Sequence, residues 1–395
     1  MDKFTRRDAV AGAAANLLLV TPEIAFGSQA NSAVTVGIIG TGGRGRYVGG
    51  HMTRDPRARL TAICDLFPDR IDLAKTLVPG GANARVYRNY HELLAQPDID
   101  AVLIATPVFL HPEHFEAACQ AKKHVYCEKP GGADVAGVKR LLRAGQNADP
   151  SRTIQFGFQQ RHSPEYLKAM SIMQQGKIGK LTLMMTYWVI GGQPMTEFKS
   201  PYPADENQKL RHWSLFRDYS GSPIVEQDCH GVDTINWFGN GHPVKAVGRG
   251  GVRFPLPYGD WSSDYHDIIY TYPDGLEGWL ISIKHTSGFR DVKEQFFGSK
   301  GMLETSRTYY KWHGPTQTAP LKNADDLQDR SLIEKGESKR EITIDAIEVF
   351  FKSIVDKKPH NMTQAAADST FTSLLGRMAY ETKREVTWDE LLRSA

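Results

Sequence analysis

The sequence VTVGIIGTGGRG at residues 34–45 carries the strongest indication of fold in this chain. Its first half, Val34 to Ile39, is a short β-branched apolar run of the kind that forms a buried strand. The loop Gly40-Thr41-Gly42-Gly43-Arg44-Gly45 follows directly, and a stretch of helical character continues to Met52. A strand, a G-x-G-x-x-G loop and a helix in this order indicate a turn that binds a dinucleotide.

Each glycine of this motif has a physical purpose. Gly40 permits the tight turn, Gly42 lets a pyrophosphate approach the backbone, and Gly45 allows the helix to pack closely on the strand. The amino end of the helix then faces the phosphates, where free N–H groups and the helix dipole favour an anion.

An acidic residue stands where the ribose of a dinucleotide is expected. The next strand-like run, 59–64, ends at Asp65, about 20 residues beyond the loop. A carboxylate there can accept hydrogen bonds from the ribose hydroxyls, which favours NAD. Arg44 could offset a 2′-phosphate, so NADP stays open as a cofactor. The alternative interpretation of Asp65 is a turn-forming residue before Leu66.

Strand and helix patterns alternate up to residue 158. Strand-like runs occur at 59–64, 84–87, 101–105, 124–127 and 153–156, and helix-like runs at 68–77, 90–95, 111–121 and 136–146. This alternation predicts an α/β fold with a doubly wound parallel sheet. We therefore expect a dinucleotide-binding Rossmann domain over residues 33–158.

Composition narrows the possible functions. The chain has 395 residues, which favours two domains. It is 41% hydrophobic and 24% charged, as in ordinary globular proteins. Its 48 basic and 45 acidic residues give a net charge of +3, which offers no case for nucleic acid or an anionic membrane as a partner. The cysteines form no metal-binding spacing, and we expect buried free thiols at Cys64 and Cys127.

The first 30 residues have the layout of an export signal. The adjacent pair Arg6-Arg7 precedes the small apolar run Ala9–Val20, and small residues follow at 27–30. This order, with the Arg pair, resembles a twin-arginine signal, although Asp8 departs from the usual continuation. The alternative is a disordered basic N-terminus. We expect a signal peptide over residues 1–30 and a periplasmic protein that is exported folded, with no membrane association after cleavage.

Six later motifs together resemble one known family. They are ATP-x-x-x-H at 105–111, KHV-x-x-EKP at 123–130, GFQQR at 157–161, GKIG at 176–179, E-x-x-x-H-x-x-D-x-x-x-W at 226–237 and GRMA at 376–379. In this order they resemble the family of glucose–fructose oxidoreductase, inositol dehydrogenase and rhizopine-catabolism proteins (Gfo/Idh/MocA). The resemblance runs from residue 34 to the end of the chain.

The resemblance implies a second domain over residues 159–395. That domain would be α/β, with a large, mostly antiparallel open sheet and a C-terminal helix. The outer face of such a sheet often makes contacts between subunits, so we expect a homodimer or homotetramer. The sequence agrees, because strand-like alternation occurs at 181–189, 244–252, 267–272 and 278–284.

The resemblance also implies the catalytic groups. Oxidising a sugar hydroxyl requires a base near neutral pKa and a cation beside the developing alkoxide. His230 is expected as the base and Lys129 as the cation. Glu226, one helical turn before His230, would share or orient the substrate hydroxyl; the family more usually has Asp here. Nicotinamide and Lys129 supply the chemistry, so no metal is expected.

Further residues are expected around the two ligands. Cofactor contacts are expected from Gly40, Thr41, Gly42, Gly43, Arg44, Gly45, Asp65, Thr106, Pro107, His111, Glu128, Lys129 and Pro130, with a cis Lys129–Pro130 peptide bond. Substrate candidates are polar or aromatic residues near the expected loops, namely Arg161, Arg211, Trp213, Asp233, Tyr265 and His266. Asp233 could instead be structural or orient His230.

These observations predict an NAD(P)-dependent oxidoreductase that acts on a sugar, cyclitol or glycoside. A freely exchanging cofactor would be lost after export, so we expect the nicotinamide to be tightly bound. The alternative enzyme is an NAD-dependent glycosidase that oxidises its substrate transiently. A non-catalytic dinucleotide sensor is a third hypothesis, and the presence of both Lys129 and His230 argues against it.

Overall fold

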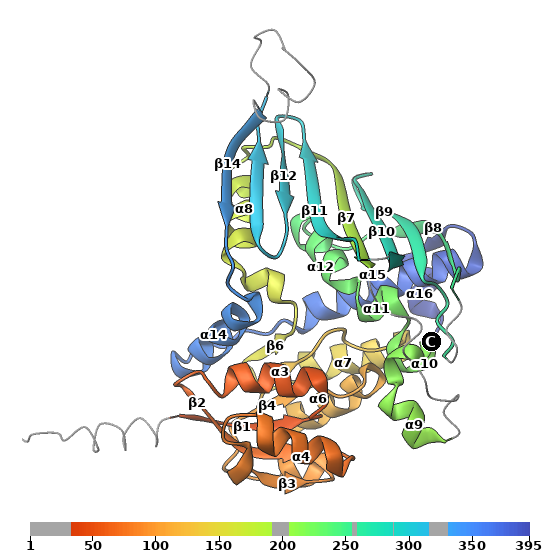
Figure 1. Cartoon of the computed structure of the whole chain (residues 1–395). Coiled ribbons are helices and arrows are strands. Elements are labelled where there is room, and N and C mark those ends of the chain that lie inside the picture. The colour runs from red at the N-terminus through yellow and green to blue at the C-terminus, as the bar shows by residue number, and fades with distance from the viewer. Residues whose placement is uncertain (1–32, 192–204, 255–258, 287, 316–330) are drawn as a thin grey trace, which may run out of the picture.

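A computed structural model describes residues 33–191, 205–254, 259–286, 288–315 and 331–395 of the chain (Figure 1). The expected twin-arginine signal lies outside the described residues. Two sheets dominate the structure, one in each half of the chain. No helix in these ranges is both long enough and apolar enough to cross a bilayer.

The first half forms a six-stranded parallel sheet, which confirms the predicted fold class. The strands lie in the order β3-β2-β1-β4-β5-β6. This order reverses direction between β1 and β4, so their carboxyl ends mark the place where such sheets bind ligands. The strands are β1 (Val34–Ile39), β2 (Ala58–Cys64), β3 (Arg85–Tyr87), β4 (Ala101–Ile104), β5 (His124–Cys127) and β6 (Ile154–Phe156).

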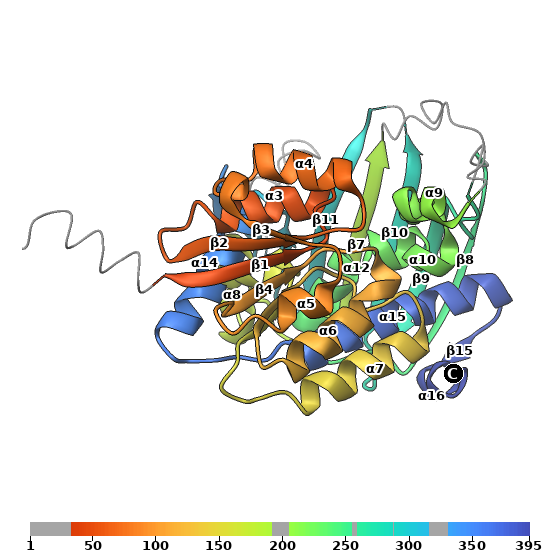
Figure 2. The same cartoon turned by 90° about the horizontal axis from the view of Figure 1, so that it is seen from below.

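Helices cover both faces of this sheet because its central strands β1, β4 and β5 are buried on both sides. Figure 2 shows α3 and α4 on one face and α5, α6 and α7 on the other. The helices are α3 (Gly43–Met52), α4 (Pro68–Leu77), α5 (Tyr90–Leu94), α6 (His111–Gln120) and α7 (Val135–Gln146). As predicted, Cys64 and Cys127 are buried free thiols in this domain.

The second half forms a nine-stranded sheet, in the order β14-β13-β12-β11-β7-β10-β9-β8-β15. Every neighbouring pair is antiparallel except β7 and β10, so the sheet is mostly antiparallel, as expected. Its strands are β7 (Leu181–Gly191), β8 (Lys245–Gly251), β9 (Tyr265–Thr271), β10 (Glu277–Thr286), β11 (Arg290–Gly298), β12 (Gly301–Thr305), β13 (Tyr309–His313), β14 (Leu332–Glu337) and β15 (Val386–Thr387).

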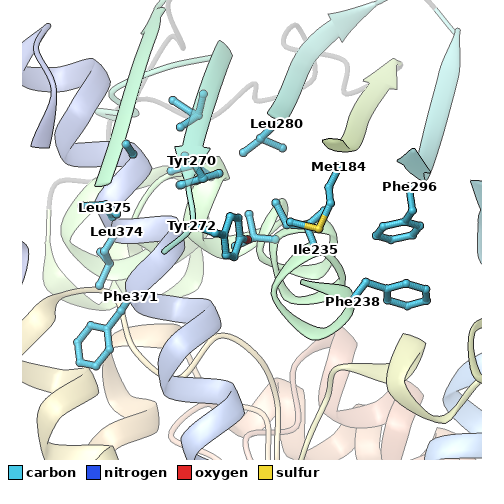
Figure 3. Packing of buried hydrophobic residues seen from close by; sticks show 14 of the residues in the cluster. Met184, Ile235, Phe238, Tyr270, Tyr272, Leu280, Phe296, Phe371, Leu374 and Leu375 are labelled. Atoms are coloured by element: carbon cyan, nitrogen blue, oxygen red, sulfur yellow. The ribbon is translucent and has the colours of Figure 1, made fainter. Parts of the chain in front are cut away.

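One face of the large sheet packs on helices to form the second core (Figure 3). Phe296 of the sheet stacks on Phe238 with ring centroids 4.1 Å apart. The helices of this half are α8 (Pro164–Gln174), α9 (Glu206–Arg211), α10 (Arg217–Ser220), α11 (Pro223–Glu226), α12 (Cys229–Phe238), α14 (Ile342–Val355), α15 (Thr363–Thr382) and α16 (Trp388–Arg393).

Helix α14 comes late in the sequence but packs against the Rossmann sheet. The first domain therefore includes a segment from beyond residue 158. Its side chains Ile347, Phe350 and Phe351 are buried in the core that the sheet forms with α3 and α4. The Phe350 ring meets Tyr126 of β5 edge-on, with centroids 5.6 Å apart. The apolar face of α14 is the part of the helix that this core buries.

Candidate active site

The glycine-rich loop is closely packed at two positions and open at a third. Gly40 has φ +90°, and a Cβ there would lie 2.7 Å from the carbonyl group of Ala105. A Cβ on Gly45 would lie only 1.9 Å from the Gly40 carbonyl oxygen, whereas one on Gly43 would meet nothing within 4 Å. The N-cap residue of α3 makes no side-chain capping bond, so the first amides of the helix face open space that a phosphate can fill.

A cavity of about 380 Å³ lies at the carboxyl ends of β1, β2 and β4. Seven of the expected cofactor residues line it, namely Gly40, Gly42, Gly43, Arg44, Asp65, Thr106 and Pro107. Sequence reasoning missed several others, including Phe67, Arg70, Tyr90, His114 and Leu210. These come from helices and turns whose facing direction no motif reveals. The open loop and this cavity together fit a dinucleotide.

Asp65 is a fixed negative charge in the cavity wall. Its Oδ2 accepts hydrogen bonds from the Thr41 amide at 2.8 Å and the Thr41 hydroxyl at 3.1 Å, and its Oδ1 accepts from the Phe67 amide at 3.0 Å. Arg44 does not neutralise this charge, because its guanidinium forms an ion pair with Glu128 at 3.0 Å. The arrangement fits the ribose of a dinucleotide.

Two of the expected cofactor residues hold the loops around the cavity together. Glu128 is buried and holds Arg44. The buried His111 ring joins two loops, with Nδ1 2.7 Å from the Pro130 carbonyl and Nε2 2.9 Å from the Thr106 carbonyl. The Lys129–Pro130 peptide bond is cis, as the sequence led us to expect.

Lys129 presents a retained positive charge at the end of β5. Its Nζ donates a hydrogen bond to the backbone carbonyl of Glu226 and lies 3.5 Å from Glu226 Oε1. Burial, the largest single effect, would lower the pKa of Lys129, but Glu226 with smaller contributions from Cys229 and Glu128 outweighs it, and the pKa is raised above its ordinary value. Lys129 is therefore an ammonium ion throughout the neutral range.

His230, on α12, is a buried and uncharged base. Burial, followed by the cations of Lys129, Arg307 and Arg44, lowers its pKa well below the ordinary value. Nδ1 lies 3.1 Å from Oε1 of the Gln160 side-chain amide. Because an amide oxygen can only accept a hydrogen bond, Nδ1 carries the ring proton. Nε2 then has the free lone pair. Trp188 stacks on the imidazole with ring centroids 5.6 Å apart.

Glu226 and His230 were expected on one helix, and the structure separates them. Glu226 ends α11, while His230 lies at the start of α12. In a continuous helix the His230 amide would bond to the Glu226 carbonyl. Instead it lies 3.5 Å from the Gln227 carbonyl, which leaves the Glu226 carbonyl to accept from Lys129. The break therefore brings the base, the acid and the lysine together.

A buried ionic cluster holds the break between the two helices. Asp228 accepts a hydrogen bond from His266 Nε2 at 2.7 Å and another from Lys284 Nζ. All three side chains are almost fully buried. His266 was expected in the substrate pocket, but it is a structural residue bonded also to Ser263.

The other substrate candidates also lie away from the His230 ring. Arg161 and Asp233 form a buried ion pair, with Arg161 Nε 2.9 Å from Asp233 Oδ2. Tyr265 follows the strand alternation to the opposite face of the sheet from His266, where the Arg253 guanidinium lies 5.0 Å from its ring centroid. Asp233 therefore has a structural role and does not orient His230.

Arg211 and Trp213 lie beside the cavity near Phe67. Arg211 forms an ion pair with Asp69 of α4 at 2.7 Å, and its guanidinium covers the Phe67 ring at 4.0 Å. Trp213 lines the cavity itself. The second domain thus contributes to the cofactor site through α9 and the turn after it.

The residues in contact with the His230 ring are Gln160, Trp188 and Phe158. Gln160 and Phe158 belong to the GFQQR motif. In the sequence this motif indicated only the connection between the two domains, so the contact with His230 was missed. Within the described parts of the chain, no cluster of three or more His, Cys, Asp or Glu residues is placed to hold a metal ion.

Comparison with known proteins places these features in one family. Residues 34–153 match the model of the oxidoreductase family with an NAD-binding Rossmann fold. The uncharacterized oxidoreductase YrbE of Bacillus subtilis is 32% identical over 269 residues, which cover 68% of this chain and 72% of that protein. Myo-inositol 2-dehydrogenase of Thermotoga maritima is 24% identical over 362 residues, which cover 90% of this chain and 99% of that protein.

Solved structures share the whole fold. Levoglucosan dehydrogenase in complex with NADH and levoglucosan superposes with a TM-score of 0.73 at 16% identity, over 90% of this chain and 99% of that one. Scyllo-inositol dehydrogenase of Lactobacillus casei with NAD(H) and scyllo-inositol has a TM-score of 0.67 at 21% identity, with the same coverage.

Proposed function

This chain belongs to the Gfo/Idh/MocA family of NAD-binding oxidoreductases, and we propose that it oxidises a secondary hydroxyl of a sugar or cyclitol with NAD. The observation that carries the proposal is the pairing of a buried neutral imidazole, His230, with the Lys129 ammonium at the carboxyl ends of the Rossmann strands. The relatives named for myo-inositol, scyllo-inositol and levoglucosan support this substrate class.

The side chains divide the proton chemistry between them. A substrate hydroxyl beside His230 donates its proton to Nε2, because the Gln160 carbonyl keeps the other ring proton on Nδ1. The Lys129 ammonium stabilises the negative charge that develops on the same oxygen. Glu226 orients the lysine and a neighbouring hydroxyl. Bound NAD supplies the acceptor for the hydride that leaves the substrate carbon.

The proposal can be tested with a panel of neutral sugars, cyclitols and nitrophenyl glycosides. Net NADH formation from a free sugar or cyclitol supports the dehydrogenase. Release of nitrophenol without net NADH formation would instead identify the NAD-dependent glycosidase. Lys129→Ala should abolish turnover and keep NAD binding; if the wild-type protein binds NAD and turns over none of these compounds, it is a sensor.

We propose NAD over NADP because the Asp65 carboxylate lines the cavity beside the glycine loop and Arg44 is engaged by Glu128. Asp65→Ser should lower the preference for NAD by removing the charge that repels a 2′-phosphate. Equal affinity of the wild-type protein for both cofactors would contradict this assignment.

We also propose that the folded protein is exported by the twin-arginine route with its cofactor retained. The support is the order of Arg6-Arg7, the apolar run and the small residues at 27–30. Denaturing protein purified from the periplasm should release bound nucleotide. Exported material whose N-terminal residue is Met1, or a fully active preparation without nucleotide, would overturn this proposal.

Finally, we propose a homodimer or homotetramer formed through the outer face of the nine-stranded sheet. Val247 of β8 and Ile333 of β14 are 43% and 53% exposed there, which is high for apolar side chains on a sheet. Sedimentation of the wild-type protein and of Val247→Lys should differ in mass, and a wild-type monomer would refute the proposal.

A further inference from the structure

Arg307 is a positive charge that the proposed reaction leaves unexplained. It lies in the turn between β12 and β13. Its Nε atom is buried without a hydrogen-bond partner, and no ion pair reaches its guanidinium from the described residues. By contrast, Arg44 and Arg161 of the same cleft are each paired with a carboxylate. A buried charged donor without a hydrogen-bond partner is unfavourable unless a ligand supplies an acceptor.

Arg307 lies beside the aromatic ring that stacks on His230. Its guanidinium is 5.7 Å from the centroid of the Trp188 ring, and the same ring stacks on His230. The charge of Arg307 contributes to the lowered pKa of His230, together with Lys129 and Arg44. Arg307 does not line the cofactor cavity, which contains the loop glycines and Asp65.

Two carboxyl groups interact electrostatically with Arg307, and both are hydrogen-bonded to other side chains or to the backbone. Glu341 caps α14 by accepting from the Thr343 amide at 3.1 Å and its hydroxyl at 2.8 Å. Glu294 accepts from the hydroxyls of Tyr166 at 2.8 Å and Thr305 at 3.0 Å. Neither lies within ion-pair distance of the guanidinium, so its positive charge is available to a ligand.

Two further buried donors near His230 lack a partner in the described part of the chain. Besides Arg307 Nε, the buried nitrogens Gln160 Nε2 and Trp188 Nε1 have no acceptor among the described residues. A hydroxyl both donates and accepts, whereas a carboxylate only accepts. A ligand with a carboxylate therefore matches this set of donors better than a fully neutral polyol.

We propose that Arg307 binds a carboxylate of the substrate, and that the substrate is accordingly a sugar acid. This inference rests on the proposed dehydrogenase function and specifies its substrate class. The planar guanidinium fork matches a carboxylate with two parallel hydrogen bonds. Arg307 is thus a specificity-determining residue, while His230 and Lys129 act on the reacting hydroxyl.

Matched pairs of substrates test the proposal on the full-length protein, loaded with NADH for the binding measurements and with NAD for the rates. D-glucuronate is compared with D-glucose, and D-galacturonate with D-galactose, by quenching of tryptophan fluorescence and by rates of NAD reduction. At least one acid should bind at least about tenfold more tightly than its neutral partner, a difference of about 1.4 kcal/mol. Arg307→Met, which keeps the aliphatic stem, should reduce that ratio to about one. Arg307→Lys should restore it only in part, because the fork is lost.

Controls separate this role from a structural or cofactor role. Arg384→Met removes an exposed arginine that pairs with Glu390 and should keep the wild-type ratio. Arg307→Met should keep the wild-type dissociation constant for NAD. If the variant instead weakens NAD while the acid preference persists, Arg307 belongs to the cofactor site and the proposal is overturned.

The remaining outcomes are also decisive. Neutral sugars oxidised as well as the acids overturn the sugar-acid assignment and leave the proposed function standing. Tighter binding of glucose 6-phosphate than of glucuronate overturns the carboxylate assignment. If neither acids nor neutral sugars bind or reduce NAD, the proposed function fails and the inference fails with it.

Discussion

Removing Lys284 should destabilise the protein more than removing any surface lysine. Its ammonium and the His266 ring both contact the Asp228 carboxylate at the break between α11 and α12. Burial would raise the pKa of Asp228, but Lys284 and His266 lower it below the ordinary value, so the carboxylate is charged. Lys284→Met keeps most of the side-chain volume and leaves that charge with only His266.

The magnitude follows from the environment of the pair. Lys284 is 1% exposed and Asp228 is 0% exposed, so water cannot replace the missing partner. Breaking a buried ion pair in this way costs about 3–5 kcal/mol. The double variant Asp228→Asn, Lys284→Met removes both charges and should regain most of that loss. The free energy of unfolding should therefore be lowest in the single variant.

Urea unfolding at pH 7 measures the effect. Lys293→Met is a matched control, because Lys293 pairs with Asp291 at 3.0 Å in a half-exposed position and should contribute at most about 1 kcal/mol. A loss below about 1 kcal/mol in Lys284→Met would refute the argument. So would a double variant no more stable than the single one.

Three further predictions concern the loop, the base and a buried acid. Gly45→Ala should lower stability by about 1–3 kcal/mol, because its Cβ would lie 1.9 Å from a backbone oxygen; Gly43→Ala should fold normally and weaken NAD binding in calorimetry. His230→Gln should lower kcat by about 10²–10⁴-fold while NAD affinity is retained. Because the pKa of His230 lies below its ordinary value, the wild-type rate should not fall until the pH is below about 6.5. A rate that already falls above that pH would contradict this. Burial raises the pKa of Glu294 to about 7, so the folded state holds a proton that the unfolded state releases near pH 4.5. Stability should therefore fall by up to about 3 kcal/mol as the pH rises from 4.5 through 7, and Glu294→Gln should flatten that dependence in urea titrations.

The parallel sheet was predictable because its signals are local. The β-branched runs, the glycine loop and the proline that starts α4 each fix a short element, and the order of elements then fixes the sheet. Asp65 was also predictable, since its position at a strand end places it beside the loop. The return of α14 was not predictable from such signals, because an apolar helix face does not say which sheet it covers.

The sequence brought the members of the candidate site to attention, but it did not predict their geometry. A spacing of four residues suggests one helical face for Glu226 and His230, yet the Asp228 cluster interrupts the helix between them. That interruption depends on Lys284, which is 56 residues away in sequence. The ion pair between Arg161 and Asp233 was not predictable for a similar reason, because no local pattern reveals which buried partner a polar side chain will find.

The position of α14 has a consequence for synthesis. The Rossmann sheet is encoded by residues 34–156, but its core includes Ile347, Phe350 and Phe351. On the ribosome, the first domain therefore cannot complete its packing until nearly nine-tenths of the chain has emerged. Until then its apolar face is available to chaperones. A fragment ending at residue 158 should accordingly be insoluble, and the two halves should mature together.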